Sequence, residues 1–305
     1  MTLSSNDVTL IDRNRRLGVA LMLFGAVLFS AKAVVIKLAY RYDIDSILLL
    51  GLRMAFSLPF FLLIGYFRRE RSITSGALRT TDIAIVIIFG IFGYYLASYT
   101  DFLGLQYLTA GMERLILFVY PTLVLLLQRL IFKTRVKPIQ WLATGICYLG
   151  IAVAFSGSDL SIDGGFPIGA ALVFLSAFLY SFYVIGSGRL APRMGTVRFT
   201  TIALVSAAIA VLLHVFASGG SLLGFPPAVY AYGVTLAVFC TVIPSYLVTE
   251  GVRRIGANDA AILGAIGPVA TIVLEYFILD EALNLVQGLG AVLVIIGVVI
   301  IGRSK

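Results

Sequence analysis

The chain has 305 residues, of which 60% are hydrophobic and only 12% are charged, whereas about a quarter of the residues in a soluble domain are charged. No tail or loop is long enough to fold alone, so the composition excludes a soluble protein and predicts an all-α polytopic membrane protein. The net charge of +8 does not indicate nucleic-acid binding, because the basic residues lie in short loops between apolar stretches and not in a patch with interleaved aromatic residues.

Ten apolar stretches follow a polar N-terminal tail at residues 1–16, and each is about long enough to cross a bilayer as a helix. The first follows Arg15 and Arg16, as a signal peptide would, but it continues to Ala39 and is longer than a typical signal core. We therefore expect ten transmembrane helices, at residues 17–39, 44–67, 83–103, 109–131, 138–156, 166–187, 196–217, 228–251, 257–279 and 285–302.

The loop charges predict the orientation of these helices. If the N-terminus and every second loop lie on one side, that side carries seventeen Lys and Arg residues, whereas the other carries only Arg41. Positive charge marks the cytoplasmic side of membrane proteins. We expect both termini in the cytoplasm, and a multi-pass protein of the bacterial cell (inner) membrane.

The two halves of the chain repeat one another, with an offset of 151 residues for the first helix and 147 from the third helix onward. Each half, residues 17–156 and 166–303, has five predicted helices, so the second repeat must be inverted relative to the first. Inverted repeats place a transport site near mid-membrane, where the halves meet. The positions that match at 147 include Phe92/Phe239, Ser98/Ser245, Tyr99/Tyr246, Gly104/Gly251 and Pro121/Pro268.

These features resemble the EamA-type transporters of the drug/metabolite transporter superfamily, which also have five plus five helices and both ends inside. The resemblance includes the segment LRMAFSLP with Arg53 and Pro59, the two SY blocks, the proline-centred helices and the acidic pair at 280–281. The first half departs from the family where Lys133-Thr134-Arg135 replaces a common acidic residue. The resemblance implies the fold and transport of a small molecule, but the family handles amino acids, sugars, nucleotides and drugs.

Six of the charged residues within the predicted spans are candidates for a site, because a charge within the membrane costs about 2.5–3.5 kcal/mol unless it finds a partner or water. They are Lys32, Arg53, Asp101, Glu113, Arg114 and Glu275. One interpretation is a hydrated vestibule that binds substrate; the other is a set of fixed ion pairs that hold helices together. We predict a substrate site built from Lys32, Arg53, Tyr99, Glu113, Arg114, Tyr120, Tyr183, Tyr246 and Glu275.

Lys32 is favoured among these charges by the internal repeat. Residues Ser176, Tyr180, Tyr183 and Ser187 form one polar stripe at helical spacing, and Tyr183 corresponds to Lys32 at the offset of 151. The lysine should therefore face the interior. Pro121 and Pro268 are predicted hinges, because proline lacks the N–H that closes a helical turn.

We expect a secondary transporter that moves a zwitterionic or anionic, amino-acid-like metabolite by alternating access. The chain lacks the GxxxxGK[ST] phosphate loop, which leaves proton coupling through Glu113 or Glu275, or passive exchange, as the source of energy. No catalytic residue, cofactor or metal is expected, since the sequence has one histidine and its two cysteines lie within spans. The expected partners are the bilayer, the small-molecule substrate and a coupling proton, without nucleic acid; the alternative is a polytopic enzyme acting on a lipid.

At the cytoplasmic helix ends, Glu250 and Asp259 are expected to form solvated pairs with Arg253 and Arg254. The sequence leaves open the substrate's identity, the direction of transport and the oligomeric state.

Overall fold

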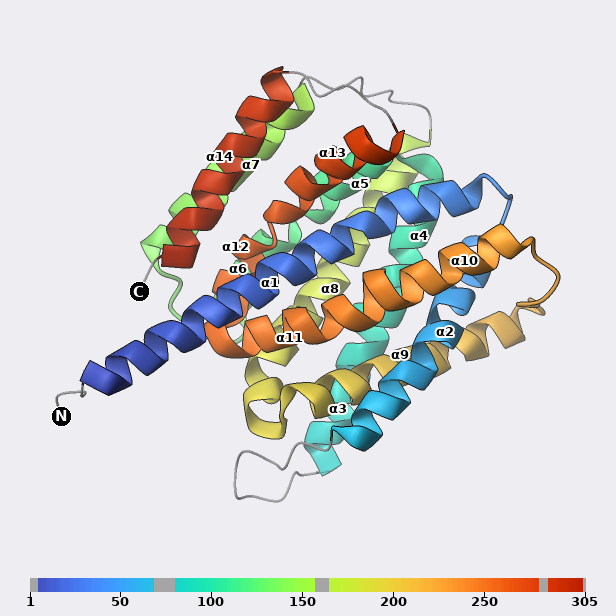
Figure 1. The fold of residues 1–305 in the computed structure, drawn as a ribbon, viewed down its shortest axis with the longest axis horizontal. Helices are drawn as coiled ribbons and strands as arrows, with labels where there is room; N and C mark the ends of the chain where they lie inside the picture. The colour runs from blue at the N-terminus through green and yellow to red at the C-terminus, as the bar shows by residue number, and fades with distance from the viewer. Residues whose placement is uncertain (1–4, 69–79, 157–164, 280–284, 304–305) are drawn as a thin grey trace.

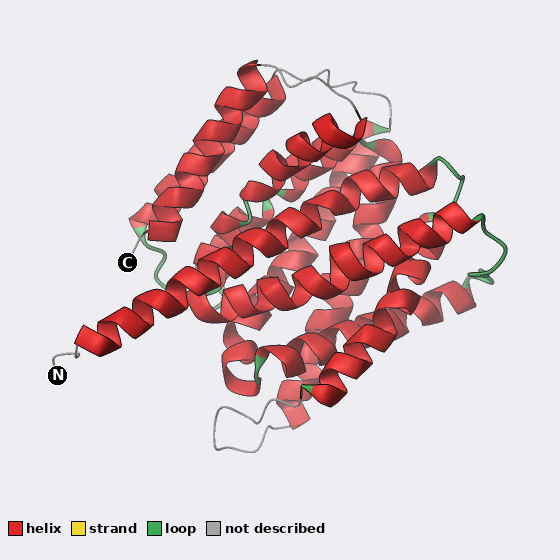
Figure 2. Cartoon of the chain, viewed as in Figure 1, coloured by secondary structure: helices red, strands yellow, loops and turns green. Residues whose placement is uncertain are grey.

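The computed structural model describes residues 5–68, 80–156, 165–279 and 285–303, which form helices and no strand (Figure 1; Figure 2). In chain order the elements are α1 (Ser5–Tyr40), α2 (Ser46–Phe67), α3 (Thr80–Gly90), the π-helical segment η1 (Ile91–Leu96), α4 (Ala97–Tyr107), α5 (Ala110–Leu117), α6 (Tyr120–Leu130), α7 (Pro138–Ser156), α8 (Phe166–Met194), α9 (Thr196–Ala217), α10 (Pro227–Ala237), the π-helical segment η2 (Val238–Val242), α11 (Ile243–Ile255), α12 (Ala257–Leu263), α13 (Ile266–Leu279) and α14 (Leu285–Arg303).

Eight helical stretches of the described residues are long and apolar enough to cross a membrane. Helices α7 and α14 coincide with the other two predicted spans, but their apolar stretches, Pro138–Val153 and Gly288–Ile301, are shorter. Helix α1 begins at Ser5, within the stretch expected as a tail. Polar residues can continue a helix beyond the bilayer because they are solvated there, and the first glycine of this helix is Gly18.

The two proline-containing spans are each divided into two helices, where the sequence predicted one. The first is interrupted between Leu117 and Tyr120, and the second between Leu263 and Ile266. Each interruption lies just before a proline, whose missing N–H would have bonded the carbonyl four residues earlier and whose ring crowds that carbonyl. The matched prolines Pro121 and Pro268 therefore account for both interruptions.

The internal repeat extends to two π-helical segments that the sequence did not predict. Segment η1 begins at Ile91 and η2 at Val238, so their starts are separated by the same 147 residues that relate the two halves of the sequence. A π-helical turn inserts an extra residue and shifts the side chains that follow to another face. Residues from Ala97 onward therefore face a direction that a regular helix would not give them.

Corresponding helices of the two halves pack against each other. Helix α2 packs on its counterpart α9, and α7 on its counterpart α14. The two interrupted spans pack crosswise, α5 on α13 and α12 on α6, while α1 lies along α10 and α11 as α8 lies along η1 and α4. In Figure 1, α7 and α14 form a pair at one edge of the bundle. This pattern brings the two interrupted spans together in the middle of the molecule.

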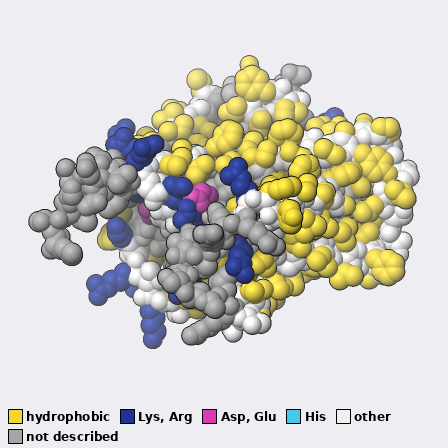
Figure 3. Space-filling model, turned by 60° about the horizontal axis from the view of Figure 1, so that its bottom comes forward, with side chains coloured by type: hydrophobic (Ala, Val, Ile, Leu, Met, Phe, Trp, Pro, Cys, Tyr) yellow, Lys and Arg dark blue, Asp and Glu magenta, His cyan; other side chains and the backbone are white. Residues whose placement is uncertain are grey.

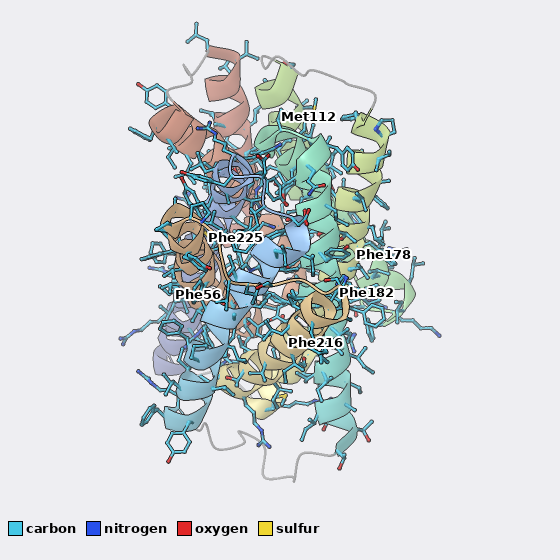
Figure 4. All side chains as sticks on the ribbon, turned by 90° about the vertical axis from the view of Figure 1, so that its right-hand side faces the viewer. Phe56, Met112, Phe178, Phe182, Phe216 and Phe225 are labelled. Carbon is cyan, nitrogen blue, oxygen red and sulfur yellow. The ribbon has the colours of Figure 1, made fainter. Side chains whose placement is uncertain are left out.

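The surface divides into an apolar part and a basic end. Figure 3 shows Lys and Arg side chains gathered at the end of the molecule where both termini lie in Figure 1, with apolar side chains covering much of the remaining visible face. On α8 the rings of Phe178 and Phe182 pack edge to face with centroids 5.1 Å apart, and Phe216 of α9 is 83% exposed (Figure 4). Apolar side chains exposed this widely suit contact with lipid.

Candidate functional site

A cavity lies where the interrupted spans meet α1, α2, α4 and α8. The empty space among its lining side chains, together with the solvent at its open mouth, has a volume of about 810 Å³. Both helix interruptions reach it, through Phe118 in the first half and Gly264 and Pro268 in the second. Irregular backbone at membrane depth is tolerated where it lines a cavity, because its unbonded groups can meet water or a ligand there.

Four of the predicted intramembrane charges form one cluster beside this cavity. The Nζ of Lys32 on α1 lies 2.5 Å from Oδ2 of Asp101 on α4 and 3.9 Å from Oε1 of Glu113 on α5. The Nε of Arg114 lies 3.1 Å from Oε2 of Glu113. Asp101 is 1% exposed and Glu113 is fully buried, so each carboxylate depends on these cations to offset its desolvation.

Local structure explains why Glu113 stands at this place. Thr109 precedes α5 and its hydroxyl accepts a hydrogen bond from the Met112 amide, at 3.2 Å, as an N-terminal cap does. Glu113 lies in the first turn that follows, where the helix dipole favours negative charge. The next residue, Arg114, turns to the cavity wall and donates to the Phe29 carbonyl at 3.0 Å.

Arg53 of α2, unlike Lys32 and Arg114, has no acidic partner within 4 Å among the residues that the structure describes. It is 2% exposed and lines the cavity. Its Nη2 donates to Oγ of Ser98 at 3.2 Å, and the guanidinium lies 5.4 Å from the centroid of the Phe102 ring. Nε and Nη1 have no hydrogen-bond partner there. Buried guanidinium donors are costly to leave unpaired, and a guanidinium can donate two parallel hydrogen bonds to an anion.

Tyrosines make up much of the rest of the cavity wall. The hydroxyl of Tyr94 shares a hydrogen bond with Ser245 at 3.0 Å, and that of Tyr120 donates to the Ala261 carbonyl at 3.0 Å. The ring of Tyr180 meets the rings of both tyrosines edge to face, with centroids 6.4 Å and 5.5 Å away. Such walls offer an organic ligand both apolar contact and hydrogen bonds.

The predicted site residues fall into three groups: residues at the cavity, tyrosines that point elsewhere, and Glu275, whose side chain lies outside the described residues. Lys32, Arg53, Arg114 and Tyr120 line the cavity, and Glu113 lies directly behind two of them.

Three predicted tyrosines point elsewhere. Tyr99 packs on the ring of His214 with centroids 4.9 Å apart, the Tyr183 hydroxyl is hydrogen-bonded to a threonine of α11 at 3.0 Å, and that of Tyr246 to a threonine of α9 at 2.9 Å. The side chain of Glu275 and the acidic pair at 280–281 lie outside the described residues.

Some cavity residues were absent from the predicted site. Tyr94 and Ser98 could have been chosen because they share a helical face with Asp101, and Tyr180 because it belongs to the polar stripe that favoured Lys32. Phe29 corresponds to Tyr180 at the offset of 151, so the repeat could also have indicated it, whereas no sequence signal distinguishes Phe118 from lipid-facing phenylalanines.

The cytoplasmic helix ends differ in part from the prediction. Glu250 pairs with Arg253 and Arg254, with both closest contacts at 2.5 Å, as expected. The expectation that Asp259 joins the same pairs is wrong: it contacts Arg15 at 3.2 Å and the Gln140 amide at 2.8 Å. The turn between α11 and α12 directs its carboxylate toward α1 and α7.

A charged and aromatic cavity enclosed by apolar, membrane-length helices is the arrangement of a multi-pass membrane transporter. The chain belongs to the EamA-like transporter family, whose model matches it twice, over residues 16–156 and 167–303. Within the described residues no group of three His, Cys, Asp or Glu side chains is placed to hold a metal ion.

Relatives and a solved structure agree with this assignment. The chain is 30% identical to uncharacterized transporter YcbK of Bacillus subtilis (strain 168) over 284 residues, covering 91% of this chain and 90% of the relative. It is 26% identical to uncharacterized transporter sll1319 of Synechocystis over 208 residues, covering 67% and 62%. A crystal structure of a protein at 17% identity superposes with a TM-score of 0.74 over 93% of this chain and 97% of that one, which shows the fold.

Proposed function

We propose that this protein is a secondary transporter of the bacterial inner membrane that moves a small anionic or zwitterionic metabolite, amino-acid-like rather than a lipophilic cation. The observation that carries the proposal is Arg53, a buried guanidinium in the cavity wall with two nitrogens unpartnered among the described residues. A carboxylate or phosphate can accept two parallel hydrogen bonds from such a group.

The charge balance of the site favours the same ligand. Arg53 and the four-residue cluster together provide three cations, Lys32, Arg53 and Arg114, and two carboxylates, those of Asp101 and Glu113. Because Lys32 and Arg114 already face the two carboxylates, one positive charge remains for a substrate. A low-dielectric cavity with excess positive charge attracts anions and repels cations.

Within this proposal, ten helices cross the membrane as two inverted repeats, residues 17–156 and 166–303, with both termini in the cytoplasm. The paired packing of corresponding helices and the matched interruptions support that arrangement. Alternating access then follows from rocking of one repeat against the other, with Pro121 and Pro268 as hinges. The driving force is proton coupling or exchange against a second solute.

A ligand screen on purified protein tests the substrate class. Small carboxylates, amino acids, organic phosphates and amines are added singly, and thermal unfolding is followed, since a ligand that binds only the folded state raises the unfolding temperature. We expect anionic or zwitterionic compounds to raise it. The increase should disappear in Arg53→Met and persist in Arg41→Met, which removes an exposed arginine of the loop between α1 and α2.

Uptake completes the test. Compounds that stabilise the protein should enter sealed proteoliposomes in a saturable manner, and entry should be lost in Arg53→Met. Stabilisation by amines alone, or an anion effect that survives in Arg53→Met, would contradict the proposal.

A further inference from the structure

We infer that Glu113 is the proton-binding group of this transporter, and that binding of a substrate anion and protonation of Glu113 favour one another. The inference rests on the proposed function, since it concerns the same cavity. It names the coupling ion and the residue that carries it.

The surroundings of Glu113 are unusual for a carboxylate that is permanently charged. Its side chain is fully buried, and neither oxygen accepts a hydrogen bond from the described residues. A permanently ionised buried carboxylate normally accepts several hydrogen bonds, because ion contacts alone offset its desolvation poorly. The carboxyl of Glu113 is therefore prepared to exist in both forms.

Groups from several helices surround this carboxyl. Lys32 comes from α1, Asp101 from α4 and Arg114 from α5 itself. Helices α7 and α8, which also pack on α5, carry Tyr148 beside Phe118 and Tyr180 beside Tyr120, and phenols are uncharged at neutral pH. Helix α13 carries Glu275, whose side chain lies outside the described residues.

Asp101 and Glu113 compete for one lysine, and Asp101 holds it more closely. The Nζ of Lys32 donates a hydrogen bond to Asp101 at 2.5 Å, whereas its distance to Glu113 is 3.9 Å. Arg114 meets Glu113 as an ion contact at 3.1 Å, but neither oxygen of Glu113 accepts a hydrogen bond from the described residues, whereas Asp101 accepts one from Lys32. Of two neighbouring carboxylates, the one whose charged form accepts fewer hydrogen bonds takes up a proton first. That group here is Glu113.

Lys32 connects this carboxyl to the substrate. Its side chain is 13% exposed and belongs to the cavity lining, so an anion beside Arg53 would also attract its ammonium. Any movement of the ammonium toward the anion weakens its contact with Glu113 and favours protonation there. Since linkage is reciprocal, protonation of Glu113 in turn frees Lys32 and tightens anion binding.

The charge balance of this step is simple. A monoanion and one proton enter together, so the net charge of the buried cluster is unchanged. The negative charge of the bound anion lies in the same low-dielectric site as Glu113, so it favours the uncharged form of that carboxyl. The inference therefore predicts that one proton crosses the membrane together with each monoanion, in the same direction.

Infrared difference spectroscopy tests the proton site without any substrate. Purified protein is moved between acidic and alkaline buffer, and the carbonyl stretch of a protonated carboxylic acid is recorded, with D2O to identify it. We expect a band that appears reversibly on acidification and is lost in Glu113→Gln. A band that persists unchanged in folded Glu113→Gln, or no reversible band in the wild type, would overturn the inference.

Two further variants keep the inference falsifiable if Glu113→Gln does not fold. At one fixed pH near neutrality, Lys32→Met should strengthen the band, because Asp101 and Glu113 both lose a cation; the band should persist in Lys32→Met combined with Asp101→Asn, where Asp101 can no longer supply it, and its loss there would assign the proton to Asp101. Asp101→Asn should weaken it, because Glu113 loses a neighbouring negative charge and gains the freed lysine. Equal bands in folded wild type, Lys32→Met and Asp101→Asn would refute the role of Glu113.

This readout separates the two proposals. If anions fail to bind in the thermal screen while the Glu113 band titrates as described, the substrate class is wrong and the proton site stands. If anions bind through Arg53 and the band is absent, the proton site is wrong and the substrate class stands.

Discussion

Replacing each of two cavity-lining cations by methionine should have different effects on stability: Lys32→Met should destabilise the protein, whereas Arg53→Met should not. Lys32→Met removes the ammonium that faces the carboxylates of Asp101 and Glu113. Breaking a buried ion pair by removing one partner costs about 3–5 kcal/mol, because the remaining charge stays buried without compensation. The unliganded Lys32→Met protein should lose stability within that range.

Arg53→Met should behave differently in the unliganded protein. The substitution removes one hydrogen bond to Ser98 and one contact with the Phe102 ring, worth about 1 kcal/mol each. It also removes two buried nitrogens that have no partner among the described residues, at about 1–3 kcal/mol each. The net change should lie between neutral and about 4 kcal/mol of added stability.

The assay is unfolding in mixed micelles with increasing sodium dodecyl sulfate, followed by the fluorescence of Trp141, the single tryptophan of the chain. Wild type, Lys32→Met and Arg53→Met are compared in the same detergent without added solutes. If Arg53→Met is destabilised as strongly as Lys32→Met, Arg53 supports the structure rather than waiting for a ligand, and the substrate proposal loses its basis.

Three other predictions follow from the fold. A reporter fused to the C-terminus should read cytoplasmic, because the loop charges are seventeen to one; an external reading would refute both the orientation and the inverted repeat. Replacing Pro121 and Pro268 together by alanine should slow transport while leaving ligand-induced stabilisation in place; a wild-type rate would make the prolines packing features only. In Gly264→Ala the new methyl would stand 1.7 Å from the Tyr120 hydroxyl, which must give up its hydrogen bond to Ala261. We expect a loss of about 1–3 kcal/mol in unfolding free energy, and an unchanged value would show that the tyrosine moves freely.

The sequence alone determined the membrane class, the positions of the apolar helices and the repeat of the two halves. Partitioning of a segment of about twenty residues into a bilayer depends mainly on that segment's own composition. The charges that must find partners could also be named, since a charge within an apolar span is costly wherever the helix packs. Lys32, Arg53 and Arg114 were found in this way, and all three line the cavity.

Only the tertiary structure decided which of those charges are paired. The repeat placed Lys32 toward the interior but left its pairing open. The packing of α1 against α4 and α5 sets it beside two carboxylates, while Arg53 on α2 contacts none among the described residues. The π-helical segments η1 and η2 were likewise not predicted from the sequence. Which charges form ion pairs, and which neighbouring helix a side chain contacts, depends on packing between helices far apart in the chain. A periodic pattern within one helix carries no information about its neighbours.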